Sequence, residues 1–83
     1  MLDKRLKEHM LHYYDAAVSE MIAKDNNISQ MDGLRMFLDS QTYEMLCDVD
    51  LEMWEFSASA MYEIWKTEKE TGDPRNSSYL RGE

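Results

Sequence analysis

Disulfides, long apolar runs and paired glycines are absent from this 83-residue chain, and each absence argues against a class of protein. Cys47 is the single cysteine and cannot form an internal disulfide, which favours a reducing cytoplasm. No apolar run exceeds three residues, so we expect no membrane-spanning helix and no membrane contact. The charged start, residues 1–5, leads into no long apolar segment, and we expect no signal peptide.

Signatures of catalysis are missing as well. The three glycines form no phosphate-binding loop, and the serines at positions 57, 59, 77 and 78 show no nucleophile-elbow pattern. Cys47 has no histidine near it in sequence, so we interpret it as a small buried side chain. We therefore expect that the protein is not an enzyme and needs no cofactor.

Cations are missing from the middle of the chain. The thirty residues 36–65 contain no Lys, Arg or His but seven carboxylates, so this window carries −7 of the net charge of −8. The same window holds both tryptophans and both phenylalanines. Its carboxylates are Asp39, Glu44, Asp48, Asp50, Glu52, Glu55 and Glu63.

This acidic and aromatic composition narrows the class of partner. A phosphate backbone requires clustered cations, so we expect no direct binding of nucleic acid. A stretch that is both acidic and aromatic-rich is typical of a surface that binds a basic partner, or of a hydrophobic core covered by an acidic, solvent-exposed surface. The sequence leaves these two readings open.

Hydrophobic periodicity predicts a first helix over roughly Asp3–Lys24. Its predicted apolar stripe follows helical spacing and is widened by Tyr14, Val18 and Ile22. The stripe consists of Leu6, Met10, Tyr13, Ala17 and Met21.

Two serines predict the next two helix starts. Ser29 opens a second helix, in which Ser29–Asp32 resembles a capping box and Gly33 allows close approach of another helix. Its expected apolar face is Met31, Leu34, Phe37 and Leu38. Ser40 caps a short third helix that ends near Cys47.

Residues 51–71 fit either one long helix or two shorter ones, and we favour a break near Phe56–Ser57. Gly72 lies where a C-terminal cap belongs, and Pro74 follows it. These features predict an all-α fold, a small bundle of about four helices in a single domain over residues 1–72. The tail, residues 73–83, is expected to be loose by itself, with docking as the alternative.

Two short stretches of the sequence partly match the ligand spacing of known metal sites. His9 and His12 lie one turn apart, but a dedicated site needs three or four fixed ligands, so we expect no metal. Residues 48–52 open like a calcium loop, yet Met53 stands where the loop needs Gly and Ser59 where it needs a bidentate Glu. A helix start is the favoured interpretation of those carboxylates.

The two tryptophans, Trp54 and Trp65, are expected to be mainly internal, because burying a large ring contributes roughly 1.5–3 kcal/mol to a small domain. An exposed tryptophan would instead be a candidate anchor for a partner.

The central run of caps and core positions resembles small helical bacterial proteins of unknown function, over residues 27 to about 70. It includes Asn27–Ser29, Gly33, Leu34, Phe37, Ser40, Thr42, Tyr43, Leu46 and Trp54. The resemblance implies a helical cytoplasmic protein, antitoxin-like where such a protein is encoded beside a toxin-like neighbour. It implies no functional residues.

The sequence therefore favours a protein-interaction module that binds, and can neutralise, a basic protein partner. The candidate interaction residues are Asp48, Asp50, Glu52, Trp54 and Glu55. The alternatives are a structural homodimer that pairs through the first helix, and a weak metal-binding protein that uses His9 and His12.

Overall fold

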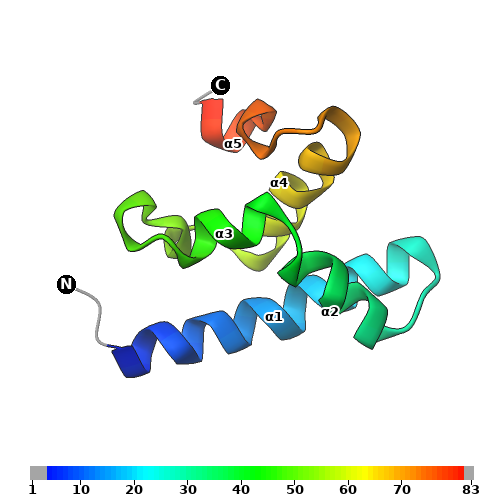
Figure 1. The fold of residues 1–83 in the computed structure, drawn as a ribbon, viewed down its shortest axis with the longest axis horizontal. Helices are drawn as coiled ribbons and strands as arrows, with labels where there is room; N and C mark the ends of the chain where they lie inside the picture. Colours follow the sequence, from blue (N-terminus) through cyan, green and yellow to red (C-terminus); the bar gives the residue numbers. More distant parts are fainter. Residues whose placement is uncertain (1–3, 82–83) are drawn as a thin grey trace.

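The computed structural model describes residues 4–81, apart from the side chains of Lys4 and Val49, and this part of the chain is helical with no strand (Figure 1). The five α-helices are α1 (Lys4–Asn26), α2 (Gln30–Leu38), α3 (Gln41–Cys47), α4 (Ala58–Thr71) and α5 (Ser78–Arg81). Two 3-10 turns, η1 (Val49–Leu51) and η2 (Met53–Glu55), lie between α3 and α4, and a third, η3 (Pro74–Asn76), lies between α4 and α5. The predicted all-α bundle is confirmed. Asp3, the expected start of the first helix, lies outside the described residues.

Serine caps set the starts of three helices. Ser29, Ser40 and Ser57 each accept a hydrogen bond from the amide three residues later, at 3.1 Å in all three cases. The hydroxyl oxygen thereby satisfies one of the helix's unpaired N–H groups. The break predicted near Phe56–Ser57 is confirmed, because α4 begins at Ala58. The shorter helix expected before the break does not form, since two 3-10 turns occupy that part of the chain.

The end of α4 also follows local rules. Gly72 adopts a left-handed conformation (φ 86°), and its N–H donates to the carbonyl of Glu68 at 2.7 Å. The tail beyond it is docked rather than loose as far as residue 81. Pro74 and Ser77 are buried, Leu80 packs against the core, and the ring of Tyr79 meets that of Phe56 edge-on.

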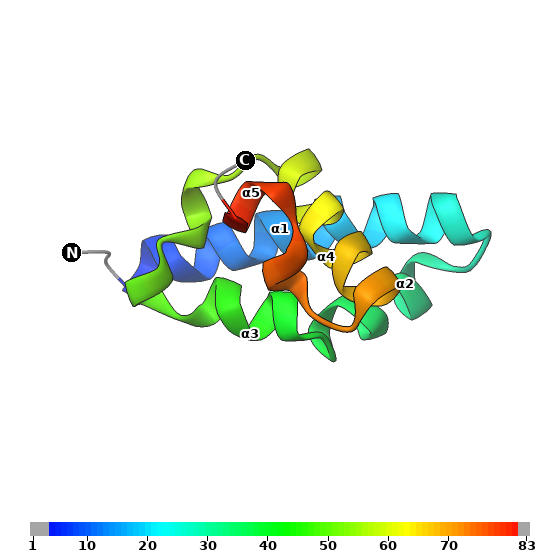
Figure 2. The ribbon, with the colours of Figure 1, turned by 90° about the horizontal axis from the view of Figure 1, so that it is seen from above.

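The first two helices form a hairpin in which α2 folds back along the C-terminal half of α1 (Figures 1 and 2). Gly33 makes the close approach possible. A Cβ atom at this position would lie 2.5 Å from the carbonyl oxygen of Ser19 and 3.2 Å from the amide nitrogen of Ala23. The role predicted for Gly33 is thus confirmed.

The prediction for the apolar face of α1 is wrong about which residues lie at its centre. Tyr14, Val18 and Ile22, predicted to be its margin, are buried in the core, while Leu6 and Tyr13 are 56% and 58% exposed. The buried face is rotated by roughly a third of a turn from the predicted one, because α2 and α4 pack against that other side of the helix.

Helix α4 packs against α1, α3 and η3 and supplies much of the core. Trp65 is buried (3% exposed), as expected, whereas Trp54 is half-buried and packs against the core from its edge. On α2, Phe37 is buried, but Met31 and Leu38 are exposed, contrary to the apolar face expected for that helix. Within residues 4–81, none of the helices combines the length with the hydrophobicity that a membrane span requires. The buried cluster comprises Tyr14, Val18, Ile22, Phe37, Leu46, Met53, Met61, Tyr62, Ile64 and Trp65.

Candidate functional site

All five candidate interaction residues lie between α3 and α4, in residues 48–56, which we call the acidic segment. The segment consists of η1, η2 and their flanks. It lies at the same end of the molecule's long axis as the N-terminal half of α1 (Figures 1 and 2). The chain reverses direction here without forming a regular helix, so the backbone needs other means to hold its shape.

The acidic segment is anchored from its inner side. Met53 is buried in the core, and Trp54 packs on the core's edge. The hydroxyl of Tyr14 on α1 donates to the carbonyl oxygens of Trp54, at 3.0 Å, and of Phe56. Burial raises the pKa of this hydroxyl, so it stays protonated and available as a donor. Of the candidate interaction residues, Trp54 is therefore placed as an anchor of the segment.

The outer side of the acidic segment carries the charge. Asp48, Asp50, Glu52 and Glu55 are all exposed, with no Lys, Arg or His in the segment. Leu51, 45% exposed, lies among them. The surface therefore combines a local charge of −4 with the apolar side chain of Leu51.

Backbone geometry at Glu52 is unusual for a residue with a side chain. Its φ of 51° places it in the left-handed region, which costs roughly 1–2 kcal/mol per residue relative to the right-handed helical conformation. Glycine would adopt this conformation without that penalty. The strained position nevertheless holds an outward-facing carboxylate.

The remaining carboxylates of the acidic window lie on other elements. Asp39 is the C-cap of α2, Glu44 belongs to α3 and Glu63 belongs to α4, and all three are exposed. An ion pair outside the window joins Arg75 Nη1 to Asp73 Oδ1 at 3.7 Å. The negative charge of the window therefore faces outward, with four of its seven carboxylates gathered on the acidic segment.

The metal patterns do not assemble into a ligand set. His9 and His12 are exposed on α1, and no group of three or more His, Cys, Asp or Glu that could hold a metal ion occurs within residues 4–81 as described. The side chain of Asp48 accepts a hydrogen bond from the amide of Asp50 at 3.0 Å, which closes the start of η1. Cys47, expected to be buried, is half-buried at the end of α3.

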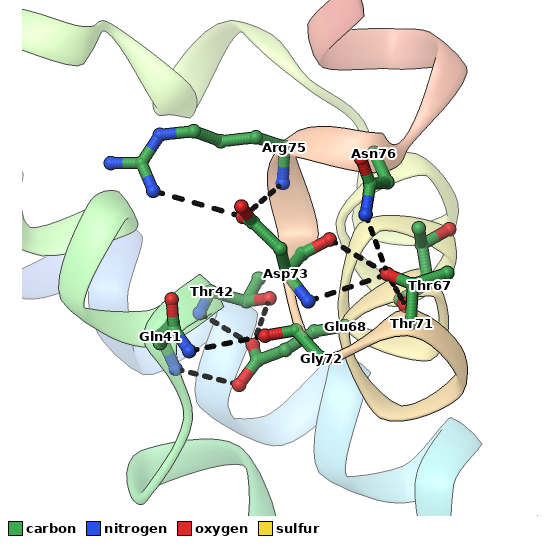
Figure 3. A network of polar contacts seen from close by, with 9 residues as sticks. All are labelled: Gln41, Thr42, Thr67, Glu68, Thr71, Gly72, Asp73, Arg75 and Asn76. Atoms are coloured by element: carbon green, nitrogen blue, oxygen red, sulfur yellow. Dashed lines mark hydrogen bonds and ion pairs between the residues drawn. The ribbon is translucent and has the colours of Figure 1, made fainter.

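Sequence reasoning missed one buried carboxylate, Glu68 of α4, which caps the start of α3 (Figure 3). Its two oxygens accept hydrogen bonds from the amides of Gln41 (3.0 Å) and Thr42 (2.8 Å) and from the hydroxyl of Thr42 (2.7 Å). A carboxylate at a helix N-terminus is favoured by the unpaired N–H groups and the helix dipole. The contact joins α3 to α4 and serves the fold.

Two cavities flank α1. One, of about 410 Å³, lies between α1 and α2, and the other, of about 460 Å³, lies between α1 and α4. The second is lined by Tyr62, whose hydroxyl donates to Asp25, and by Trp65 with Lys69 positioned 5.5 Å from its ring centroid. The pKa of Tyr62 is raised to about 12, chiefly by burial and next by the hydrogen bond to Asp25.

Comparison with known proteins identifies no family for this chain. A scan against protein-family models and searches of curated proteins and of solved structures found no match to this chain.

Proposed function

We propose that this chain is a non-enzymatic protein-interaction module of the cytoplasm, which binds and can neutralise a basic protein partner through its acidic segment. The observation that supports the proposal is the outward display of Asp48, Asp50, Glu52 and Glu55 on an anchored backbone. Clustered charge of one sign speeds encounter with a partner of the opposite sign and suppresses wrong partners.

Anchoring matters for affinity because binding must otherwise order the loop. The buried Met53 and the hydrogen bonds from Tyr14 fix the acidic segment in the free protein, so less conformational entropy is lost when a partner binds. The left-handed Glu52 supports the same reading, since strained positions often cluster at functional surfaces. An antitoxin-like role is one instance of such a module.

A homodimer remains the second candidate, because the face of α1 that carries Leu6 and Tyr13 is exposed. The proposal of a basic partner and that of a homodimer are compatible, since the acidic segment and this face are different surfaces. Sedimentation equilibrium decides the second candidate: a monomeric mass at micromolar concentration rules out a stable dimer.

The test of the first proposal is association with the product of the adjacent gene, measured at low and at high salt. We expect binding that weakens by about tenfold or more as salt screens the exposed charges. A variant that neutralises the acidic segment, with Asp48→Asn, Asp50→Asn, Glu52→Gln and Glu55→Gln, should lose most of the binding and most of its salt dependence.

A matched control removes the same charge elsewhere, with Glu8→Gln, Glu20→Gln, Asp39→Asn and Glu63→Gln, all at exposed positions. Equal loss in both variants would mean that net charge, and not the acidic segment, determines binding. Absence of binding, or binding that ignores salt, would contradict the proposal.

A further inference from the structure

The cavity between α1 and α2 has no assigned occupant, and none of its lining residues belongs to the acidic segment. It measures about 410 Å³ and combines apolar side chains with a single carboxylate. The lining residues that matter below are His12, Asp15, Ser19, Gln30, Met31 and Leu34.

Asp15 lacks a donor for one of its oxygens. Its Oδ1 atom is enclosed by the protein and has no hydrogen-bond partner among the described residues. Burial raises the pKa of the Asp15 carboxyl, and the nearby His12 lowers it by a smaller amount. Enclosed carboxylate oxygens are normally paired, because an unpaired charge in a low-dielectric site is costly. The fold therefore holds a carboxylate that a cation or a donor would stabilise.

The walls around Asp15 include apolar side chains, and the His12 and Gln30 side chains, which carry N–H donors, make no hydrogen bond to its Oδ1 atom. Met31 is 59% exposed, and Leu34 is half-buried. The buried Ser19 hydroxyl donates to the carbonyl of Ala16 at 3.1 Å, so its proton is not available to the carboxylate of Asp15. This pattern suits a side chain that has an aliphatic stem and a planar cationic head with several donors.

We propose that this cavity receives an arginine side chain of the basic partner, with its guanidinium against Asp15 and its stem along Met31 and Leu34. The source of the arginine rests on the proposed function. The terminal torsion of an aspartate is broad, so a small rotation of the carboxylate presents both oxygens to the fork of a guanidinium. In this arrangement the acidic segment attracts the partner, and the cavity fixes its register.

The first experiment uses two short peptides that differ at one position. One carries a single arginine between uncharged residues, and the other carries citrulline, which has nearly the same shape without the charge. We expect saturable changes in the amide NMR signals of Asp15, Ser19 and Leu34 with the arginine peptide, and affinity about tenfold lower with citrulline. Equal affinities for the two peptides would overturn the proposal.

The second experiment compares two variants of the same helix. Asp15→Asn preserves the shape of the side chain and removes its charge, and Glu20→Gln removes one charge from an exposed position of α1. Asp15→Asn should weaken binding of the arginine peptide by about tenfold, while Glu20→Gln should leave it within about twofold. An unchanged affinity in Asp15→Asn would refute the cavity as the binding site.

A stability measurement distinguishes a direct loss of binding in Asp15→Asn from unfolding of that variant. Because the pKa of Asp15 is raised above its ordinary 3.8, the charged form disfavours folding, and its contribution to stability falls as pH rises above 3.8. His12 on α1 and Tyr43 on α3 are the ionisable neighbours that interact with it. Asp15→Asn should therefore be slightly more stable than the wild type at neutral pH, with the difference disappearing below 3.8. Reduced stability at neutral pH would count against an unpaired charge at this site.

Binding of the partner protein to these variants distinguishes a failure of the cavity inference from a failure of the proposed function. If its binding depends on the acidic segment but is unaffected by Asp15→Asn, the cavity inference fails and the proposed function stands. If the arginine peptide saturates the cavity but no salt-sensitive protein partner is found, the proposed function fails while the cavity's preference for a guanidinium holds.

Discussion

At the scale of single residues, the contact between α1 and α2 depends on the absence of a side chain at Gly33. Glycine within a helix lowers its stability by about 1 kcal/mol relative to alanine, so its presence here needs a compensating gain. The gain is proximity, since Gly33 lies against the backbone of Ser19 and Ala23 and is itself buried. Close backbone contact lets the short α2 cover the C-terminal half of α1.

Gly33→Ala should therefore destabilise the protein despite its favourable helix propensity. The new Cβ would meet the carbonyl oxygen of Ser19 at 2.5 Å, and a backbone atom cannot move aside as a flexible side chain does. Overpacking of this kind typically costs about 1–3 kcal/mol, which exceeds the gain in propensity at the upper end of that range. Urea unfolding measures the change in the free energy of unfolding.

Arg35→Ala, at an exposed position of α2, is the matched control and should change stability by less than about 0.5 kcal/mol. An increase in stability for Gly33→Ala would show that the two helices separate without loss.

Residue-level features were predictable from the sequence where they depend on neighbours along the chain. Ser29, Ser40 and Ser57 each cap a helix that begins at the next residue, and Gly72 closes α4. The cap from Glu68 was not predictable, because the amides it accepts from lie 26 and 27 residues away and become neighbours only after α3 packs on α4.

At the scale of elements, α1 shows why periodicity alone left the core face unresolved. Apolar residues cover more than half of its circumference, so two adjacent stripes both satisfy helical spacing. The face with Tyr14, Val18 and Ile22 is buried because α2 and α4 pack there, and that choice depends on the tertiary arrangement. The break near Phe56–Ser57 was predicted correctly, but the carboxylates of residues 48–52 were interpreted as a helix start, and short 3-10 turns form there instead. The tether of the acidic segment to α1 through Tyr14 carries no local sequence signal.

Tyr14→Phe should loosen the acidic segment without disturbing the core ring. The substitution removes the hydroxyl that donates to the carbonyls of Trp54 and Phe56. A lost hydrogen bond is worth about 1 kcal/mol, which corresponds to roughly five- to tenfold faster hydrogen exchange. The amides of Glu55 and Phe56, which close η2, report on this opening.

Tyr13→Phe provides the control, because Tyr13 is the exposed neighbour on the same helix and its ring lies edge-on to that of Tyr14. It should leave exchange at Glu55 and Phe56 unchanged. Equal acceleration in both variants would mean that the effect does not come from the hydrogen bonds of the Tyr14 hydroxyl.

At the scale of the whole molecule, a net charge of −8 acts on only 83 residues. A chain of this size buries a modest fraction of its surface, so its margin of stability is small. Four of the excess charges sit together on the acidic segment, and their mutual repulsion opposes folding. The feature that we propose for partner recognition thus reduces the stability of the free protein.

This repulsion predicts how stability responds to salt. Added sodium chloride should raise the free energy of unfolding, because screening at physiological ionic strength acts over about 8 Å and weakens repulsion among the exposed carboxylates. Neutralising the acidic segment changes the net charge from −8 to −4, since four carboxylates are removed, and should shrink the salt effect. The measurement requires urea, since guanidinium chloride is itself a salt.

The control variant with Glu8, Glu20, Asp39 and Glu63 neutralised also has a net charge of −4 but keeps the cluster, so its salt effect should remain the larger of the two. Equal salt effects in the two variants would mean that total charge, rather than its concentration on the acidic segment, governs the electrostatics of this protein.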